Sequence, residues 1–151
     1  MREIEKLSSI SRRNIRQYDG SPVDVSLNVR VEPDMEDRTV TLVVGVSYYT
    51  INRLMRVRLL QYTVAAVFEF DDCSGHVSVG GDSCMVNTQT MLMMLGVTIG
   101  SLRGMLALRT AGTFLSRYPM PIINISELVS RFAYGTGTPE GSRPLFNHVF
   151  E

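Results

Sequence analysis

The stretch Asn87–Leu128, NTQTMLMMLGVTIGSLRGMLALRTAGTFLSRYPMPIINISEL, decides the fold because it holds the clearest helix signals of the chain. Two polar residues suited to capping a helix, Asn87 and Thr88, precede an apolar run that begins at Met91. Methionine and leucine dominate the start of this run, and both are good helix formers. We expect the chain before this stretch to form the sheet on which its helices pack.

Gly96 and Gly100 interrupt the apolar run, and Ser101 offers a second N-cap before apolar residues return at helical spacing. The stretch therefore predicts a short helix followed by a longer one. The longer helix must end before the segment Tyr118–Pro121, because neither of its two prolines can continue a helix. A third helix is predicted to begin at Ser126.

Three segments before this stretch have the pattern of strands. Val23–Val31 alternates apolar and polar residues, whereas Arg38–Ile51 and Met55–Phe70 are longer and rich in β-branched residues. Glu32–Asp37 and Asp71–Val86 are rich in turn-forming residues, and the second of these has room for one short strand. Strands followed by helices predict an α+β arrangement.

The long strands could each reach roughly 45 Å, which exceeds the usual strand length, so we expect them to bend. We predict an antiparallel, strongly curved meander sheet of about four strands, with two to three C-terminal helices packed on one face. At 151 residues the chain is expected to be a single domain. Its parts are a lead-in (1–20), a sheet region (23–86), a helical region (87–134) and a C-terminal loop or tail (135–151).

The second face of the predicted sheet carries Thr41, Val43 and Gly45, and it is less polar than a solvated face should be. Two interpretations remain open. Either these residues are simply exposed, as many apolar residues are in any protein, or self-association covers them.

The whole-chain composition excludes some classes of partner. Fifteen basic residues balance fifteen acidic ones, so binding to nucleic acid or to an anionic membrane would need a local patch. The apolar run from Met91 to Ile99 is about half of a membrane span, and no transmembrane helix is expected. The N-terminal MREIEKLSSISRR lacks a signal-peptide core, which favours the cytoplasm. In that compartment Cys73 and Cys84 are expected to be free thiols.

Residues that carry chemistry do not form a recognised motif in this chain. The possible metal ligands are Cys73, His76, Cys84 and His148. Their spacing matches no known ligand pattern, so no metal is predicted. The glycines Gly75, Gly80 and Gly81 lack a phosphate-binding motif, and no nucleophile elbow is present. We predict no cofactor and no enzymatic activity.

Arginines gather in two parts of the sequence and could form a basic patch. They are Arg12, Arg13, Arg16, Arg53, Arg56 and Arg58. Acidic residues in Glu32–Asp37 and the neutral total favour solvated surface or pairing between subunits over nucleic-acid binding.

The order of motifs in the second half resembles the SecB family of protein-export chaperones. The motifs that carry the resemblance are Leu95-Gly96, Gly112-Thr113-Phe114, Pro119, Pro121, Ile122-Ile123-Asn124-Ile125 and Glu127-Leu128. Ala65-Ala66-Val67-Phe68 is similar to the family's central strand. The resemblance covers roughly Val23 to Phe132. It departs from the family at Gly100–Gly104, where the family's Pro-Tyr-Ala-Arg-Glu segment is absent.

This resemblance implies an ATP-independent holdase that binds unfolded polypeptide or preprotein in apolar grooves, where flexible methionine suits clients of many shapes. The residues proposed for the client-binding groove are Tyr48, Tyr62, Phe68, Met91, Leu92, Met94, Leu95, Leu102, Met105 and Leu106. For each of them, packing in the core is the competing interpretation. The implied partners are an export motor ATPase or an antitoxin of a toxin-antitoxin pair.

The resemblance also implies a homo-oligomer, a dimer or tetramer, without nucleic acid and without membrane insertion. Two alternatives remain open. One is a small-ligand-binding or enzymatic domain that uses the concave face of the sheet. The other is a structural oligomer without chaperone activity, in which subunit contacts consume the apolar surface.

Overall fold

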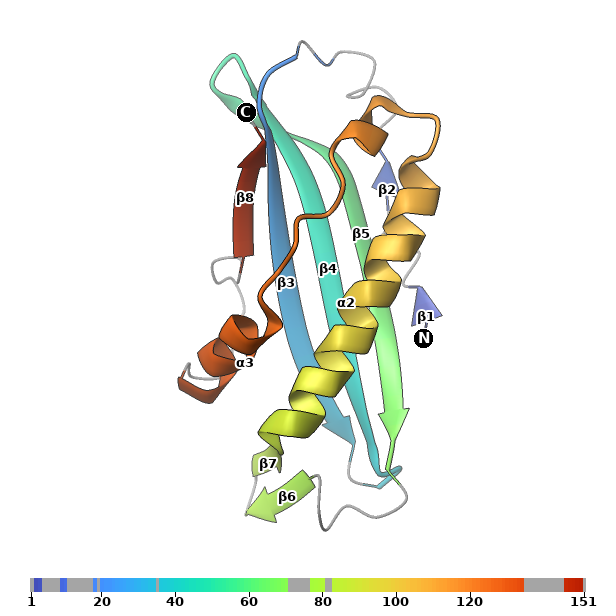
Figure 1. The fold of residues 1–151 in the computed structure, drawn as a ribbon, viewed down its shortest axis with the longest axis vertical. Coiled ribbons are helices and arrows are strands. Elements are labelled where there is room, and N and C mark those ends of the chain that lie inside the picture. Colours follow the sequence, from blue (N-terminus) through green and yellow to red (C-terminus); the bar gives the residue numbers. More distant parts are fainter. Residues whose placement is uncertain are drawn as a thin grey trace.

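The computed structural model describes residues 2–3, 9–10, 18, 20–34, 36–70, 77–80, 83–134 and 146–150. Three long antiparallel strands form its centre (Figure 1). They are β3 (Val23–Asp34), β4 (Thr39–Asn52) and β5 (Met55–Glu69). The three predicted strands are confirmed, and strands followed by helices make the fold class α+β.

Short strands extend both edges of this sheet. They are β1 (Arg2–Glu3) and β2 (Ser9–Ile10), which pair with β5, and β8 (Phe146–Phe150), which pairs with β3. The order across the sheet is β1-β5-β4-β3-β8, with β2 beside β5. The end of the chain was expected to be a loop, and its residues 146–150 instead form an edge strand. Their partner on β3 is distant in sequence, so no local pattern could identify the pairing.

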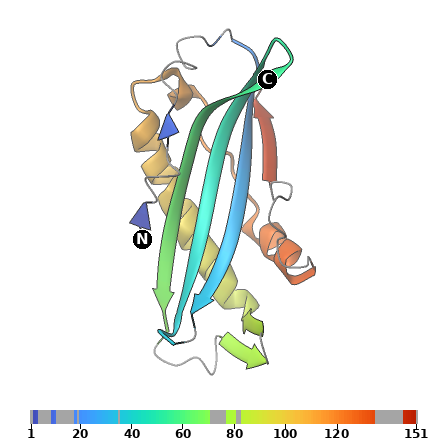
Figure 2. The same ribbon diagram turned by 180° about the vertical axis from the view of Figure 1, so that it is seen from behind.

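Two features of the expected sheet are not observed. The long strands twist but do not curl strongly (Figure 2). A bulge interrupts the pairing of β4 with β5 between Tyr48 and Tyr49, where β5 has one extra residue. The expected short strand is part of a separate hairpin made of β6 (Val77–Gly80) and β7 (Ser83–Val86), so it does not join the main sheet.

The connection between β4 and β5 is a tight two-residue turn. Asn52 pairs with Met55, which leaves Arg53 and Leu54 as the turn residues. Both have positive φ, at 47° and 68°, as the hairpin turns that match strand twist require. Such turns favour Asn-Gly, because a residue with a Cβ reaches this conformation at a cost of about 1–2 kcal/mol.

A single long helix, α2 (Thr88–Thr110), crosses one face of the sheet diagonally (Figure 1). The Asn87 side chain accepts a hydrogen bond from the backbone N–H of Gln89 at 2.8 Å, as expected of an N-cap. The prediction of two helices here is wrong, because Gly96 and Gly100 lie within one continuous helix. The buried side chains around them hold α2 against the sheet, and this packing outweighs the weak helix propensity of glycine.

By length and composition α2 is long and apolar enough to cross a membrane. A helix in the core of a soluble protein can have the same length and composition. Nine of its residues are buried in the fold: Thr90, Met91, Met94, Leu95, Thr98, Ile99, Leu102, Leu106 and Thr110.

The chain returns over the same face of the sheet after α2. A 3-10 turn, η3 (Phe114–Arg117), is followed by an extended crossing segment (118–124) and by α3 (Ile125–Tyr134). The predicted third helix is confirmed within a residue, and the Asn124 side chain accepts a hydrogen bond from the backbone N–H of Glu127 at 3.3 Å. The longer helix, which we expected to end before Tyr118, ends earlier, at Thr110, and Gly112 follows with a φ of 76°.

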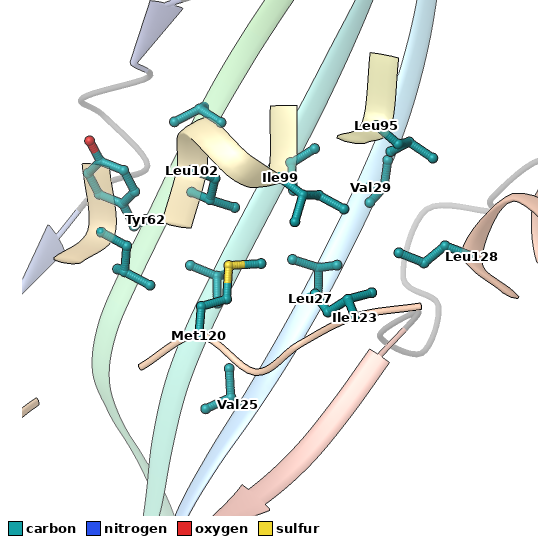
Figure 3. Packing of buried hydrophobic residues seen from close by; sticks show 14 of the residues in the cluster. Val25, Leu27, Val29, Tyr62, Leu95, Ile99, Leu102, Met120, Ile123 and Leu128 are labelled. Carbon is teal, nitrogen blue, oxygen red and sulfur yellow. The ribbon is translucent and has the colours of Figure 1, made fainter. Parts of the chain in front are cut away.

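One hydrophobic core lies between the sheet and this helical layer (Figure 3). Alternate residues of the strands face it, among them Val25, Leu27 and Val29 of β3. Met120 and Ile123 of the crossing segment enter the core from the other side. The faces that the alternating pattern predicted for the three long strands are therefore confirmed.

The opposite face of the sheet has no described helix over it (Figure 2). Its central residues are small and largely shielded by their neighbours. They are Ser26, Val43, Ser47, Thr63 and Ala65, each no more than 8% exposed. This face therefore needs less cover than its sequence suggested, since few large apolar side chains lie on it.

An aromatic cluster joins three distant parts of the chain at one end of α2. The rings of Tyr18 and Phe114 are stacked at 4.3 Å, and Tyr118 contacts both Phe114 and Phe150 edge-on. The hydroxyl groups of Tyr18 and Tyr118 lie 3.1 Å apart, within hydrogen-bond distance. These contacts attach η3 to the start of β3 and to the end of β8.

Candidate functional site

The residues proposed for a client-binding groove come together in the fold, but most lie inside the core. Seven are buried: Tyr48, Tyr62, Met91, Met94, Leu95, Leu102 and Leu106. Three are half-buried: Phe68, Leu92 and Met105. The sequence pattern identified residues that share one surface of contact between α2 and the sheet. In this structure that contact is closed, so a client could reach the seven only if α2 moved away from the sheet.

Tyr48 is the most unusual residue of this set. Its side chain is fully buried, and its hydroxyl group makes no hydrogen bond to any described residue. Burial raises the pKa of its phenol well above the ordinary value. The side chain therefore stays neutral, and its unpartnered hydroxyl is a cost to folding of about 1–3 kcal/mol.

The outer face of α2 carries apolar and small residues in one row. We define this outer row as Met93, Val97, Gly100, Gly104 and Leu108. Its three large members are 61%, 52% and 80% exposed, respectively. A Cβ added at either glycine would meet no atom within 4 Å, so the row is open to the outside along its length.

The charges of α2 lie away from the outer row. The helix has only two charged residues, Arg103 and Arg109. Arg103 is half-buried and donates a hydrogen bond from Nη2 to the carbonyl oxygen of Pro121 at 3.0 Å. The Arg109 guanidinium lies 5.9 Å from the ring centroid of Tyr62. Both arginines are thus turned towards neighbouring elements, and the outer row presents no charge of its own.

The crossing segment adds one further apolar side chain to the surface. Arg103 holds this segment against α2 through Pro121, and Met120 and Ile123 anchor it in the core. Ile122, which lies between these anchors, is 92% exposed. An isoleucine held outwards by buried neighbours cannot turn inwards without breaking those contacts.

Sequence reasoning missed these exposed residues because it selected the side of α2 that faces the sheet. Met93 lies between two selected residues and Val97 lies two residues after Leu95, but both are exposed on the opposite side of the helix. The helical repeat separates the two sides once the buried set is known. The sequence alone does not say which of two apolar sides faces the sheet.

The described part of the chain holds no group of three or more His, Cys, Asp or Glu residues placed to bind a metal ion. Cys73 and His76 lie outside the described residues, and the side chains of Cys84 and His148 are not described. Of the arginines considered for a basic patch, Arg12, Arg13 and Arg16 also lie outside the described residues.

Comparison with protein-family models gave no match, and neither did comparison with curated proteins or with solved structures. The likeness to export chaperones therefore depends only on the motifs quoted from the sequence.

Proposed function

We propose that this chain is an ATP-independent holdase of SecB-like type, which binds unfolded polypeptide through exposed apolar side chains. The observation that carries the proposal is the uncharged outer row of α2, together with Ile122 on the crossing segment. Exposed apolar side chains scattered singly are normal in folded proteins. An uncharged row along several turns of one helix is less common, and it is the kind of surface that binds a partner.

The energetics of holding a client suit this surface. Removing apolar area from water contributes about 25 cal/mol per Å², and it needs no bond of fixed direction. Met93 can adapt to different clients because its side chain is unbranched and polarisable. Gly100 and Gly104 leave shallow gaps between the larger residues, where a client side chain could fit.

Three residues of the proposed groove are partly open to solvent. Phe68, Leu92 and Met105 are half-buried, so a bound polypeptide can contact them without any movement of α2. The seven buried residues support the surface from beneath. We propose that they keep α2 in place and do not contact clients directly while the helix is docked on the sheet.

The partners of this proposal are unfolded polypeptides or preproteins, with an export motor ATPase or an antitoxin as the dedicated partner. A cytoplasmic location and a dimeric or tetrameric assembly belong to the same proposal. No cofactor is needed, because the binding energy comes from apolar burial alone.

A structural oligomer is the second candidate function, and the spacing of glycines in α2 favours it. Gly100 and Gly104 lie four residues apart in the outer row, and glycine in an exposed helix costs about 1 kcal/mol relative to alanine. Small residues at this spacing allow two helices to approach closely. A second copy of α2 could therefore occupy the outer row. The concave-face alternative has no such support, because α2 and the crossing segment fill that face of the sheet.

The test is suppression of aggregation without nucleotide. A slow-folding polypeptide is diluted from denaturant with the protein, and light scattering is compared with that of an inert protein control. We expect stoichiometric suppression by the wild type and a loss of most of it in Met93→Gln/Val97→Gln. The matched control is Val67→Thr, which changes an exposed valine on the sheet and should keep full suppression.

Unchanged aggregation with several client polypeptides would reject the general holdase. If the same Met93→Gln/Val97→Gln variant then changed the size of the protein in solution, the outer row would be a subunit contact. That result would favour the structural oligomer.

A further inference from the structure

The β4–β5 hairpin projects beyond the rest of the sheet (Figures 1 and 2). The last residue pair between β3 and β4 is Val23 with Thr50, and β8 ends at the same level with Phe150. The pairing of β4 with β5 continues to Asn52 and Met55. The hairpin tip, defined as residues 51–58, is therefore a two-stranded ribbon with no described strand beside it.

The hairpin tip carries its largest apolar side chains at the positions most open to water. Leu54 is 98% exposed, Met55 is 70% exposed and Ile51 is 62% exposed. Leu54 also has a φ of 68°, a conformation that glycine or asparagine adopts more readily. A leucine at this position buries nothing within the fold and fits the turn poorly. Its side chain therefore contributes to folding neither by burial nor by local conformation.

Arginines surround these apolar side chains. Arg53, Arg56 and Arg58 are exposed within the hairpin tip, and the whole segment from Arg38 to Phe68 contains no aspartate or glutamate. One carboxylate approaches from β3, where Asp24 Oδ2 lies 3.4 Å from Arg56 Nη2. Among the described residues, the hairpin tip thus brings three guanidinium groups near one carboxylate, and these side chains together are positive although the chain as a whole is neutral.

Two of the arginines are held along the hairpin and do not fold over its end. The Arg56 guanidinium lies 3.8 Å from the ring centroid of Tyr49, and Arg58 Nη1 donates a hydrogen bond to Gln61 Oε1 at 2.6 Å. Both contacts point back towards the sheet, away from Leu54. The apolar side chains at the end and the arginines behind them thus form separate layers of the hairpin tip. We call the arginine layer, Arg53, Arg56 and Arg58, the positive collar.

We propose that the hairpin tip binds the surface of a membrane rich in anionic phospholipid. Leu54, Met55 and Ile51 would enter the boundary between headgroups and acyl chains, while Arg53, Arg56 and Arg58 bind phosphate groups above it. This is contact with the interface, and it differs from a helix that spans the bilayer. The inference goes beyond the proposed function and does not depend on it.

The shape of the hairpin tip favours lipid over a protein partner. A stable protein interface buries about 800 Å² on each side, and a convex ribbon end of eight residues offers little area of that kind. A fluid bilayer needs no matching pocket, because headgroups rearrange around an inserted side chain. The positive collar supplies the charge complementarity that an uncharged apolar tip would lack.

The test uses the full chain and vesicles in a sedimentation assay. One set is phosphatidylcholine alone, and the other is equal parts phosphatidylcholine and phosphatidylglycerol. We expect the wild type to sediment with the anionic vesicles and not with the neutral ones. Raising the salt to about 1 M should release it, because screening weakens the contact between arginine and phosphate.

The decisive variant is Arg53→Asn/Leu54→Gly, which converts the turn to Asn-Gly. This pair of residues suits positive φ at both positions, so the variant should fold at least as stably as the wild type. It should bind anionic vesicles at least about tenfold more weakly, since one arginine and the most exposed leucine are lost. The matched control is Arg30→Gln/Val67→Thr, which removes an exposed arginine and an exposed valine elsewhere and should bind as the wild type does.

The proposal is overturned if the wild type binds neither kind of vesicle or binds both equally. It is also overturned if the Arg53→Asn/Leu54→Gly variant binds anionic vesicles as tightly as the wild type does. Absence of vesicle binding together with a changed oligomeric state in that variant would assign the hairpin tip to a contact between copies. The aggregation assay contains no lipid, so the holdase proposal and this inference can fail independently.

Discussion

Tyr48 buries a hydroxyl group that finds no hydrogen-bond partner among the described residues. Tyr48→Phe removes that group without changing the shape of the ring, so we expect stability to rise by about 1 kcal/mol. For a chain of this size the melting temperature should increase by about 2–4 °C. Tyr62→Phe is the control, because the Tyr62 ring lies near Arg109 and its hydroxyl group is not a buried group without a hydrogen-bond partner. A lower melting temperature for Tyr48→Phe would reveal a hydrogen bond with a part of the chain that the structure does not describe.

The pH dependence of stability tests the same residue in a second way. Burial raises the pKa of Tyr48 above the unfolded value of about 10, so below that pH the phenol is neutral in both the folded and the unfolded chain and its titration does not affect stability. Above it the unfolded chain loses the proton while the folded chain keeps it, and stability falls. The advantage of Tyr48→Phe over the wild type should therefore grow by about 1 kcal/mol by about pH 11. Denaturant unfolding of both proteins at neutral pH and at about pH 11 measures this difference in stability. A difference that is the same at the two pH values would contradict the burial of the phenol.

Met93 and Met94 are neighbours in sequence with opposite environments, which makes a matched pair of substitutions. Met94 is fully buried, so Met94→Asp places a carboxylate in the core and should cost about 3–5 kcal/mol, enough to lose soluble protein. If Met94 lined an open groove, this variant would instead keep its fold and lose client binding. Met93 is 61% exposed, so Met93→Asp should fold and weaken client binding instead. Soluble expression and circular dichroism separate the two; a folded Met94→Asp would show that α2 detaches from the sheet easily.

At the scale of the element, α2 combines a buried side that fixes it to the sheet with an outer row that no described residue covers. We expect Gly100→Leu to dissociate a helix-mediated oligomer, because the added side chain fills the space through which a second helix would approach. The monomer should stay folded, since no atom lies within 4 Å of the new Cβ position. Light scattering after size-exclusion chromatography measures the mass of the assembly.

The control for this substitution is Ser126→Leu, which adds a leucine at an exposed position of α3. It should leave the mass unchanged. An assembly that survives Gly100→Leu would place the subunit contact elsewhere, with the small-residue face of the sheet as the next region to test.

At the scale of the whole molecule, β8 closes one edge of the main sheet. Truncation before Phe146 should expose the backbone donors and acceptors of β3 along Val23–Leu27 and remove the contact between Phe150 and Tyr118. An uncovered edge strand pairs readily with other chains, so we expect a lower melting temperature and aggregation that grows with concentration. Scattering measured across a dilution series tests this. A truncated protein that stays monodisperse at all concentrations would show that β8 does not protect this edge.

The three long strands and their buried faces could be predicted from the sequence, because alternation of apolar and polar residues is a local property. Val25, Leu27 and Val29 face the core as their spacing requires. The ten residues proposed for a groove come together in the fold, seven of them buried and three half-buried. Whether these residues form an open groove or a closed core depends on how closely α2 packs on the sheet. The sequence of α2 does not indicate this distance.

What the sequence alone determined is the α+β class, the strands, their inward faces and a cap and start for the helical region. Only the tertiary structure decided that α2 is continuous, because packing of Leu95, Ile99 and Leu102 on the sheet outweighs the cost of the glycines between them. It also decided the edges of the sheet and the projection of the hairpin tip. These features depend on contacts between residues far apart in the chain, such as Val23 with Phe150, and local periodicity carries no information about such contacts.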